Sequence, residues 1–177
     1  MKRRPKDIGT AAETAVVRYL QANGFAGAER RALRGGTDAG DITGCQGLAW
    51  EVKYRDRPVS DAQITAWVAE TETERINAAA DIGILVVRRP RANVAAWWAV
   101  IPLDVAAYLA SPYDAISHGG PPVRMLLADA VRLLRGAGYG DPLDDKASLS
   151  FASPPGGPAT GSHSPDHAQD QLPEVTR

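Results

Sequence analysis

The stretch GLAWEVKYR, residues 47–55, constrains the fold of this chain more than any other segment. Apolar and charged side chains alternate in it, with Trp50 and Val52 interleaved with Glu51 and Lys53. Successive side chains of a β-strand point to opposite faces of the sheet, so this alternation predicts a strand. One face of that strand would pack on a core, and the other would hold an acid and a lysine side by side.

A hairpin is predicted around this strand. Residues 41–45 are expected to form a short strand, and Gln46 and Gly47 a tight turn before the strand at 48–55. The two strands would bring Asp41 close to Glu51 and Lys53. If Asp41 shares their face, two carboxylates and an ammonium group converge at one place.

Such a cluster has a chemical use. Two neighbouring carboxylates repel each other unless a cation neutralises them, and Mg²⁺ commonly takes one or two protein carboxylates together with waters and a phosphate. The ion can activate a water and offset charge on a phosphodiester, while a lysine stabilises the developing negative charge. The residues Asp41, Glu51 and Lys53 are therefore candidates for phosphodiester hydrolysis.

The remaining elements favour an α/β fold. A helix that connects the hairpin to the apolar ILVV strand implies a mixed central β-sheet flanked by helices. Ser60 is the expected N-cap of that helix, and its ETETER half is expected to face solvent. The other helices are expected at residues 7–23, 104–110 and 122–135, the connecting helix at 59–80, and the other strands at 28–33, 81–88 and 96–103.

Composition narrows the classes of protein. The 177-residue chain contains 44% hydrophobic residues, enough for a core, and nothing close to the roughly 18 consecutive apolar residues of a membrane span. Its start lacks the apolar segment of a secretory signal. One cysteine, Cys45, and three histidines cannot build a zinc site of the usual Cys/His kind. We expect a cytoplasmic protein whose metal, Mg²⁺ or Mn²⁺, would have oxygen ligands.

Charge divides the chain into two parts. Residues 1–140 contain 18 Lys/Arg and 15 Asp/Glu, or +3, and residues 141–177 contain 2 and 6, or −4. The composition from residue 139 onward predicts a disordered acidic tail at 139–177 after a domain at 1–138. Basic clusters in the domain suit a polyanion such as DNA, although each alone could be an ordinary solvated surface.

The order of these residues resembles a known family. An Asp, a hairpin and Glu-x-Lys, here GDITGCQGLAWEVK at residues 40–53, resemble the signature of PD-(D/E)XK nucleases. A preceding helix that contains Glu13 and ends in a Gly-Phe step is similar to that of archaeal-type Holliday junction resolvases. The resemblance covers residues 6–87 and implies a restriction-endonuclease-like fold and homodimers that cut four-way DNA junctions. Separately, the richness in Ala, Arg and Gly suggests a GC-rich genome, bacterial or phage.

The resemblance also implies roles for individual residues. Asp41 and Glu51 would be metal-binding acids, Lys53 the catalytic lysine, and Glu13 a helix glutamate that supports the metal. Gln63 would lie near the active site. Arg31 or Arg34 and Thr37 fall where the family has an arginine and a hydroxyl residue that touch DNA. The basic clusters add Arg30, Arg55 and Arg57 as candidates for DNA contact.

Departures and alternatives stay open. Gly40 stands where the motif usually has proline, and Asp38 competes with Asp41 for the role of the first acid. Glu51 and Lys53 could be a simple ion pair on a strand surface, worth about 0.2–1 kcal/mol. Other readings are a general repair or restriction-type nuclease of the same fold, and a non-catalytic DNA-binding or assembly module.

Overall fold

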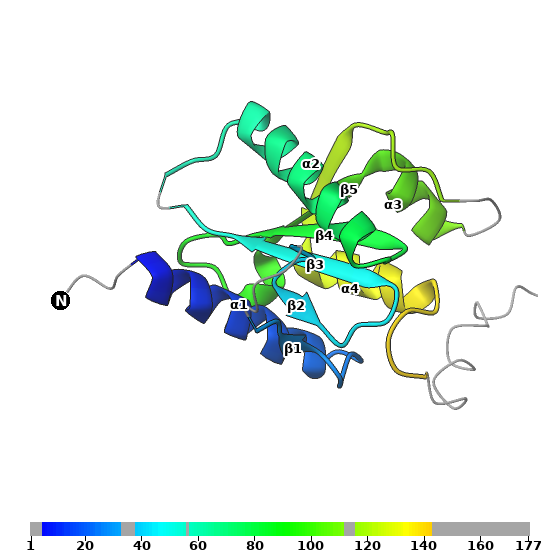
Figure 1. Ribbon diagram of the computed structural model, residues 1–177, viewed down its shortest axis with the longest axis horizontal. Coiled ribbons are helices and arrows are strands. Elements are labelled where there is room, and N and C mark those ends of the chain that lie inside the picture. Colours follow the sequence, from blue (N-terminus) through cyan, green and yellow to red (C-terminus); the bar gives the residue numbers. More distant parts are fainter. Residues whose placement is uncertain (1–4, 33–37, 56, 112–115, 143–177) are drawn as a thin grey trace, which may run out of the picture. The chain divides into compact units, whose positions relative to one another are not determined.

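A mixed β-sheet with the predicted hairpin strand inside it forms the centre of the molecule. The computed structural model describes residues 5–32, 38–55, 57–111 and 116–142, and within them six strands pair in the order β1-β2-β3-β4-β5-β6 (Figure 1). The strands are β1 (Glu29–Arg30), β2 (Ile42–Thr43), β3 (Leu48–Lys53), β4 (Ile82–Val87), β5 (Trp98–Pro102) and β6 (Pro122–Leu126).

The parallel pair β3–β4 confirms the predicted crossover. These two strands run in the same direction, with Lys53 beside Val87, and the other neighbouring pairs are antiparallel. Parallel neighbours need a long connection, and here α2 (Asp61–Asn77) supplies it. Ser60 caps this helix, since its side chain accepts a hydrogen bond from the Gln63 N–H, at 3.3 Å.

Helices cover both faces of the sheet. The other helices are α1 (Pro5–Gln21), the 3₁₀ helix η1 (Val94–Ala96), α3 (Leu103–Ala110) and α4 (Leu127–Gly136). Residues of α1, α3 and α4 share one buried cluster with Trp50 and Ile84, and Cys45 is buried there. A smaller cluster joins Ile64 and Trp67 of α2 to the opposite face of the sheet. The sheet therefore has two buried faces, and α2 lies against the second of them.

The last predicted helix, at residues 122–135, is wrong in its first part. Residues 122–126 form β6, which pairs antiparallel with β5 and places Met125 opposite Ala99, and only the remainder is helical in α4. Val123 and Met125 pack against the main core, whereas Arg124 is exposed. Pairing with the otherwise open edge of β5 overrides the local helical pattern.

The folded unit runs past the predicted boundary at residue 138. Tyr139 packs against the main core, and Asp141 bonds to the turn after α1, where its side chain accepts from the Ala26 N–H, at 2.9 Å. The Asp141 N–H in turn donates to the Gly24 carbonyl, at 2.8 Å. Most of the predicted tail lies outside the described residues. Within the described ranges, no helix has the length and apolar character needed to cross a membrane.

Candidate active site

The two faces of β3 divide its side chains as the sequence alternation predicted. Trp50 and Val52 belong to the main core, while Lys53 binds Glu51 and Glu70 on the side that α2 covers. Glu51 is only 7% exposed. The charged face is thus a narrow site between the sheet and a helix rather than an open strand surface.

Asp41 is held beside this face by the backbone of β3. Its N–H donates to the Trp50 carbonyl, at 2.8 Å, and its Oδ2 accepts from the Val52 N–H, at 2.9 Å. Asp38 instead lies exposed, and its side chain accepts from the Gly40 N–H, at 3.3 Å. Of the two competing acids, Asp41 is therefore the one with its carboxylate fixed against the strand of Glu51.

Gly40 explains why this chain departs from the proline of the motif. Its φ of +86° is open to glycine, whereas proline is restricted to about −65°. A Cβ at this position would lie 2.8 Å from the Trp50 carbonyl oxygen. Because Gly40 immediately precedes Asp41, this close approach of two backbones sets the position of the acid.

Asp41 and Glu51 form a coupled pair of carboxyl groups. Burial, and next the charge of Glu51, raise the pKa of Asp41 to about 7, although the Val52 N–H opposes that shift. Burial also raises the pKa of Glu51 to about 7, with Lys53 acting in the opposite direction. Burial and the charge of the neighbouring carboxylate together favour a state in which one of the two groups carries a proton. Without a cation, the pair resists holding two negative charges near neutral pH.

Lys53 lies between two carboxylates. Its Nζ is 2.7 Å from Glu51 Oε1 and 3.0 Å from Glu70 Oε2. Burial lowers the pKa of Lys53, but the hydrogen bonds and charges of these glutamates outweigh it and raise the pKa above its usual value. Lys53 is consequently a fixed positive charge and not a proton acceptor.

Glu74 is an acid that the sequence interpretation missed. The ETETER half of α2 was expected to face solvent, but Thr71 and Glu74 are buried, and Glu74 is only 5% exposed. Burial followed by the charge of Asp38 raises its pKa, and its own charge, after burial, raises the pKa of Glu51. Its Oε2 has no hydrogen-bond partner among the described residues. The spacing of Ile64, Trp67, Thr71 and Glu74 along one helix face was the signal that could have revealed it.

Glu13 lies near the site but is bound to Arg30. The Arg30 Nε and Nη2 donate to Glu13 Oε2, at 2.8 and 2.5 Å. The charge of Glu13 contributes to raising the pKa of Asp41, after burial and Glu51. The predicted supporting acid is thus within electrostatic reach, whereas the predicted DNA contact Arg30 is occupied by an ion pair.

The other predicted positions have varied surroundings. The Arg31 N–H donates to the Asp41 carbonyl and its Nε to the Gly40 carbonyl, which braces the segment that carries the acid. Gln63 lies in the first turn of α2, and the contacts of this helix with the site come from Glu70 and Glu74 instead. Arg34 and Thr37 lie outside the described residues.

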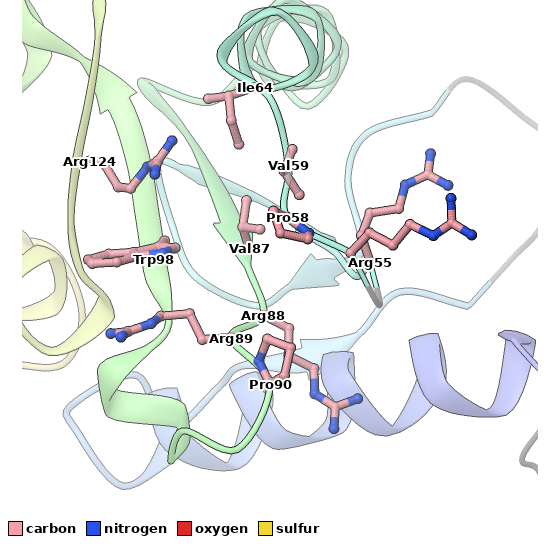
Figure 2. A pocket seen from close by; sticks show the side chains of 11 residues that line it. Arg55, Pro58, Val59, Ile64, Val87, Arg88, Arg89, Pro90, Trp98 and Arg124 are labelled. Carbon is pink, nitrogen blue, oxygen red and sulfur yellow. The ribbon is translucent and has the colours of Figure 1, made fainter.

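Arg55 and Arg57 are exposed and line a separate cavity beyond the end of β3 (Figure 2). The Arg55 guanidinium lies 5.6 Å from the centroid of the Trp67 ring. Both predicted contacts are therefore available to a ligand, at a distinct place from the acidic cluster.

Comparisons with family models, curated proteins and solved structures find no match. The fold and site together define an α/β protein with a mixed sheet and a buried acidic cluster under α2. Its activity has to be inferred from the chemistry of that cluster.

The donor set fits a hard divalent cation. Among the described residues no three His, Cys, Asp or Glu side chains are already arranged around a common metal position. Mg²⁺, however, usually takes one or two protein carboxylates and completes its shell with water and phosphate. Asp41 and Glu51 supply such a pair. The buried Oε2 of Glu74, which has no hydrogen-bond partner among the described residues, is a further oxygen that a cation would stabilise.

Proposed function

We propose that this protein is a metal-dependent DNA endonuclease that hydrolyses phosphodiester bonds, with a four-way junction as the substrate. The observation that carries the proposal is the carboxyl pair of half-buried Asp41 and buried Glu51, with Lys53 bound to Glu51. Removing two carboxyl groups and an ammonium group from water costs free energy, and groups with pKa values shifted in this way gather at functional sites. The resemblance of residues 6–87 to PD-(D/E)XK resolvases supports the same reading.

Each residue has a chemical role in this proposal. A bound Mg²⁺ would lower the pKa of a water and polarise the phosphate. Asp41 and Glu51 would hold the ion, and the Val52 N–H would keep Asp41 oriented toward it. Lys53, permanently protonated between Glu51 and Glu70, would offset the negative charge that develops on the phosphate oxygens.

The proposed partners are DNA and a second copy of this chain. Junction cutting needs two active sites at a fixed separation, which a homodimer provides. A general repair or restriction-type nuclease would use the same cluster on other DNA. A non-catalytic DNA-binding module would keep the Lys53–Glu51 ion pair for structure alone.

A cleavage assay tests the proposal. The full chain is incubated with Mg²⁺ and a synthetic four-way junction, linear duplex, single strand or flap. We expect paired nicks in the junction, abolished in Asp41→Asn and Glu51→Gln and retained in Glu29→Gln, which removes an exposed acid from β1. Cutting of every substrate would indicate a general nuclease. Binding without cutting in Mg²⁺ and in Mn²⁺ would contradict an enzyme.

Metal binding gives a readout that does not depend on activity. We expect Glu51→Gln and Glu74→Gln to weaken Mn²⁺ affinity, measured by calorimetry, by about tenfold or more. The matched control is Glu72→Gln, since Glu72 is on the same helix but bonds to Arg75. Equal Mn²⁺ affinity of all four proteins would mean that no ion binds at this cluster.

A further inference from the structure

A cavity, here called the arginine pocket, lies beyond the end of β3 that carries Lys53. It measures about 240 Å³ and is formed by the segment after β3, the end of β4, and single residues of α2, β5 and β6. Val87 lines it and is the register partner of Lys53, so the pocket adjoins the acidic cluster along the sheet. Figure 2 shows the pocket from close by.

The lining of this pocket is strongly cationic. Among the residues that the structure describes, five arginines and no acidic side chain line it, namely Arg55, Arg57, Arg88, Arg89 and Arg124. Within the described ranges only Arg124 has a carboxylate partner, the fully exposed Asp61, at 3.6 Å. Surface pairs of this kind contribute little, so most of the positive charge remains available to a ligand.

The arginines fall into two groups around an apolar floor. Arg89 and Arg124 flank Trp98, with guanidinium carbons 4.2 and 5.7 Å from the ring centroid, and Arg55 lies at the opposite side (Figure 2). Arg57 also lines the pocket and comes from the same segment as Arg55, after β3. Arg88 extends toward α1, and its guanidinium carbon lies 4.8 Å from the centroid of the Tyr54 ring, so it contributes least to the positive charge inside the pocket.

One of the flanking cations is fixed in place. Arg89 Nη1 donates to the Ala96 carbonyl, at 2.8 Å, in addition to its contact with Trp98. Val59, Ile64 and Val87 supply apolar wall between the two arginine groups. A cation held in position before binding loses less side-chain entropy when a ligand arrives, which favours specific anion binding.

We propose that the arginine pocket binds a phosphate group of a nucleotide strand and thereby holds the strand whose bond is cut at the acidic cluster. The second clause rests on the proposed function; the first does not. Guanidinium groups match phosphate oxygens in a bidentate manner and stay charged at any physiological pH. The apolar floor beside them suits the sugar and base that accompany a phosphate, which a bare acidic polymer lacks.

Binding of labelled oligonucleotides by anisotropy, with EDTA present so that nothing is cut, tests the pocket. The double variant Arg57→Gln/Arg124→Gln removes one exposed arginine from the segment after β3 and one from β6. We expect it to weaken binding by about tenfold or more and to reduce by about 2 the slope of log affinity against log salt concentration. The control Arg18→Gln/Arg132→Gln removes the same charge from α1 and α4. It should change affinity by less than about threefold and keep the slope.

Several outcomes would overturn the proposal. Equal losses in the pocket and control variants would mean that only total charge matters, and unchanged binding by the pocket variant would mean that no phosphate is held there. Polyglutamate that competes as well as DNA of equal charge would contradict a phosphate-specific pocket.

The source of the phosphate is distinguished by strand ends. A preference for 5′-phosphorylated over unphosphorylated oligonucleotides, lost in the pocket variant, would support a terminal phosphate, and equal binding of the two would support an internal phosphodiester.

The proposed nuclease activity and the proposed phosphate pocket can be contradicted independently of each other. A wild-type protein that never cuts but loses DNA affinity in the pocket variant would overturn the nuclease and leave the pocket standing.

Discussion

At the residue scale, the candidate site depends on backbone groups as much as on its charged side chains. Gly40 permits a close approach to β3. The Trp50 carbonyl then accepts from the backbone N–H of Asp41, and the Val52 N–H donates to its side-chain carboxylate. The motif itself could be read from the sequence because Glu51 and Lys53 must share a strand face. The reason for glycine at position 40 could not be read from the sequence, since it depends on a contact across the hairpin.

Gly40→Ala should therefore lower the stability of the fold and shift the position of Asp41. We expect a loss of about 1–3 kcal/mol in the free energy of unfolding, since alanine is strained at this φ and its Cβ would crowd the Trp50 carbonyl. Denaturant titration of the variant measures this loss. Gly119→Ala, where a Cβ meets open space, is the matched control, and equal stability of the two variants would contradict the expectation.

The carboxyl pair predicts an unusual pH dependence of stability. The pKa values of Asp41 and Glu51 are raised to about 7 in the folded protein, so folding is favoured when they are protonated. Without divalent metal, the stability they contribute should be lost as pH rises from about 4, near their usual pKa values, to about 7. Melting temperatures across this range measure the effect.

Added Mg²⁺ should restore stability at the upper end of that range, because the ion favours the ionised pair. Asp41→Asn should flatten the metal-free profile, since the amide can still accept from the Val52 N–H but does not titrate in this range. A metal-free wild-type protein whose melting temperature rises with pH across this range would contradict the coupled pair.

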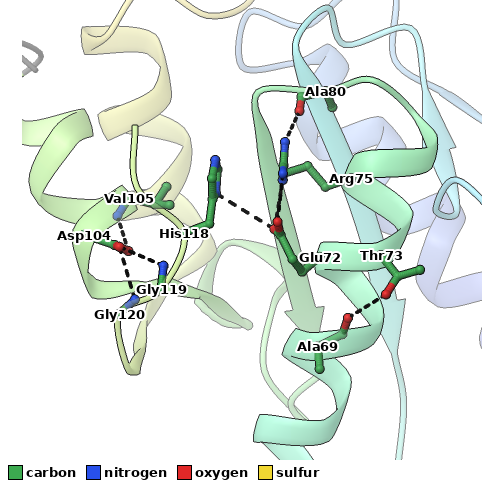
Figure 3. A network of polar contacts seen from close by, with 10 residues as sticks. All are labelled: Ala69, Glu72, Thr73, Arg75, Ala80, Asp104, Val105, His118, Gly119 and Gly120. Atoms are coloured by element: carbon green, nitrogen blue, oxygen red, sulfur yellow. Dashed lines mark hydrogen bonds and ion pairs between the residues drawn. The ribbon is translucent and has the colours of Figure 1, made fainter. Parts of the chain in front are cut away.

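At the element scale, α2 connects the two parallel strands and also closes the site. Its buried face carries Trp67 against the sheet and Glu74 against Glu51. Its C-terminal half is fixed by Arg75, which donates to both oxygens of Glu72 and to the Ala80 carbonyl (Figure 3). His118, from the segment before β6, lies 3.9 Å from Glu72 and extends the network across the sheet face.

Arg75→Gln should accordingly destabilise the fold. We expect a loss of about 1–3 kcal/mol, because the Ala80 carbonyl and Glu72 lose their partner at a site where Arg75 is only 17% exposed. Arg132→Gln breaks the ion pair of the same spacing in α4, where Arg132 is 78% exposed, and should cost under about 1 kcal/mol. Thermal unfolding compares the two variants, and a larger loss for Arg132→Gln would refute this account.

At the scale of the whole molecule, the folded unit ends later than the change in composition. Tyr139 and Asp141 lie in the Gly- and Asp-rich stretch where a disordered tail was predicted, yet they pack on the core and on the turn after α1. Composition reports the average tendency of a segment to order itself. It does not report whether a few of its residues find partners far away in the sequence.

Two truncations separate these boundaries. Deletion of residues 143–177 should leave the melting temperature within a few degrees of the full chain. Deletion from Tyr139 onward should lower the free energy of unfolding by about 1–3 kcal/mol, because it removes an apolar contact, leaves the Ala26 N–H without its partner and leaves the Gly24 carbonyl with Arg135 alone. Insolubility of the shorter deletion, or equal stability of both, would contradict this boundary.

The sequence by itself determined the hairpin, the crossover helix, the mixed sheet and the grouping of Asp41, Glu51 and Lys53, because these follow from local periodicity and turn chemistry. Only the tertiary structure decided that residues 122–126 form a strand and that Arg30 binds Glu13. It alone also brought Glu74 close to Glu51 of β3 and gathered arginines from three segments into one pocket. The physical reason is that periodicity specifies which face a side chain occupies, whereas its neighbour on that face depends on which elements meet across the sheet.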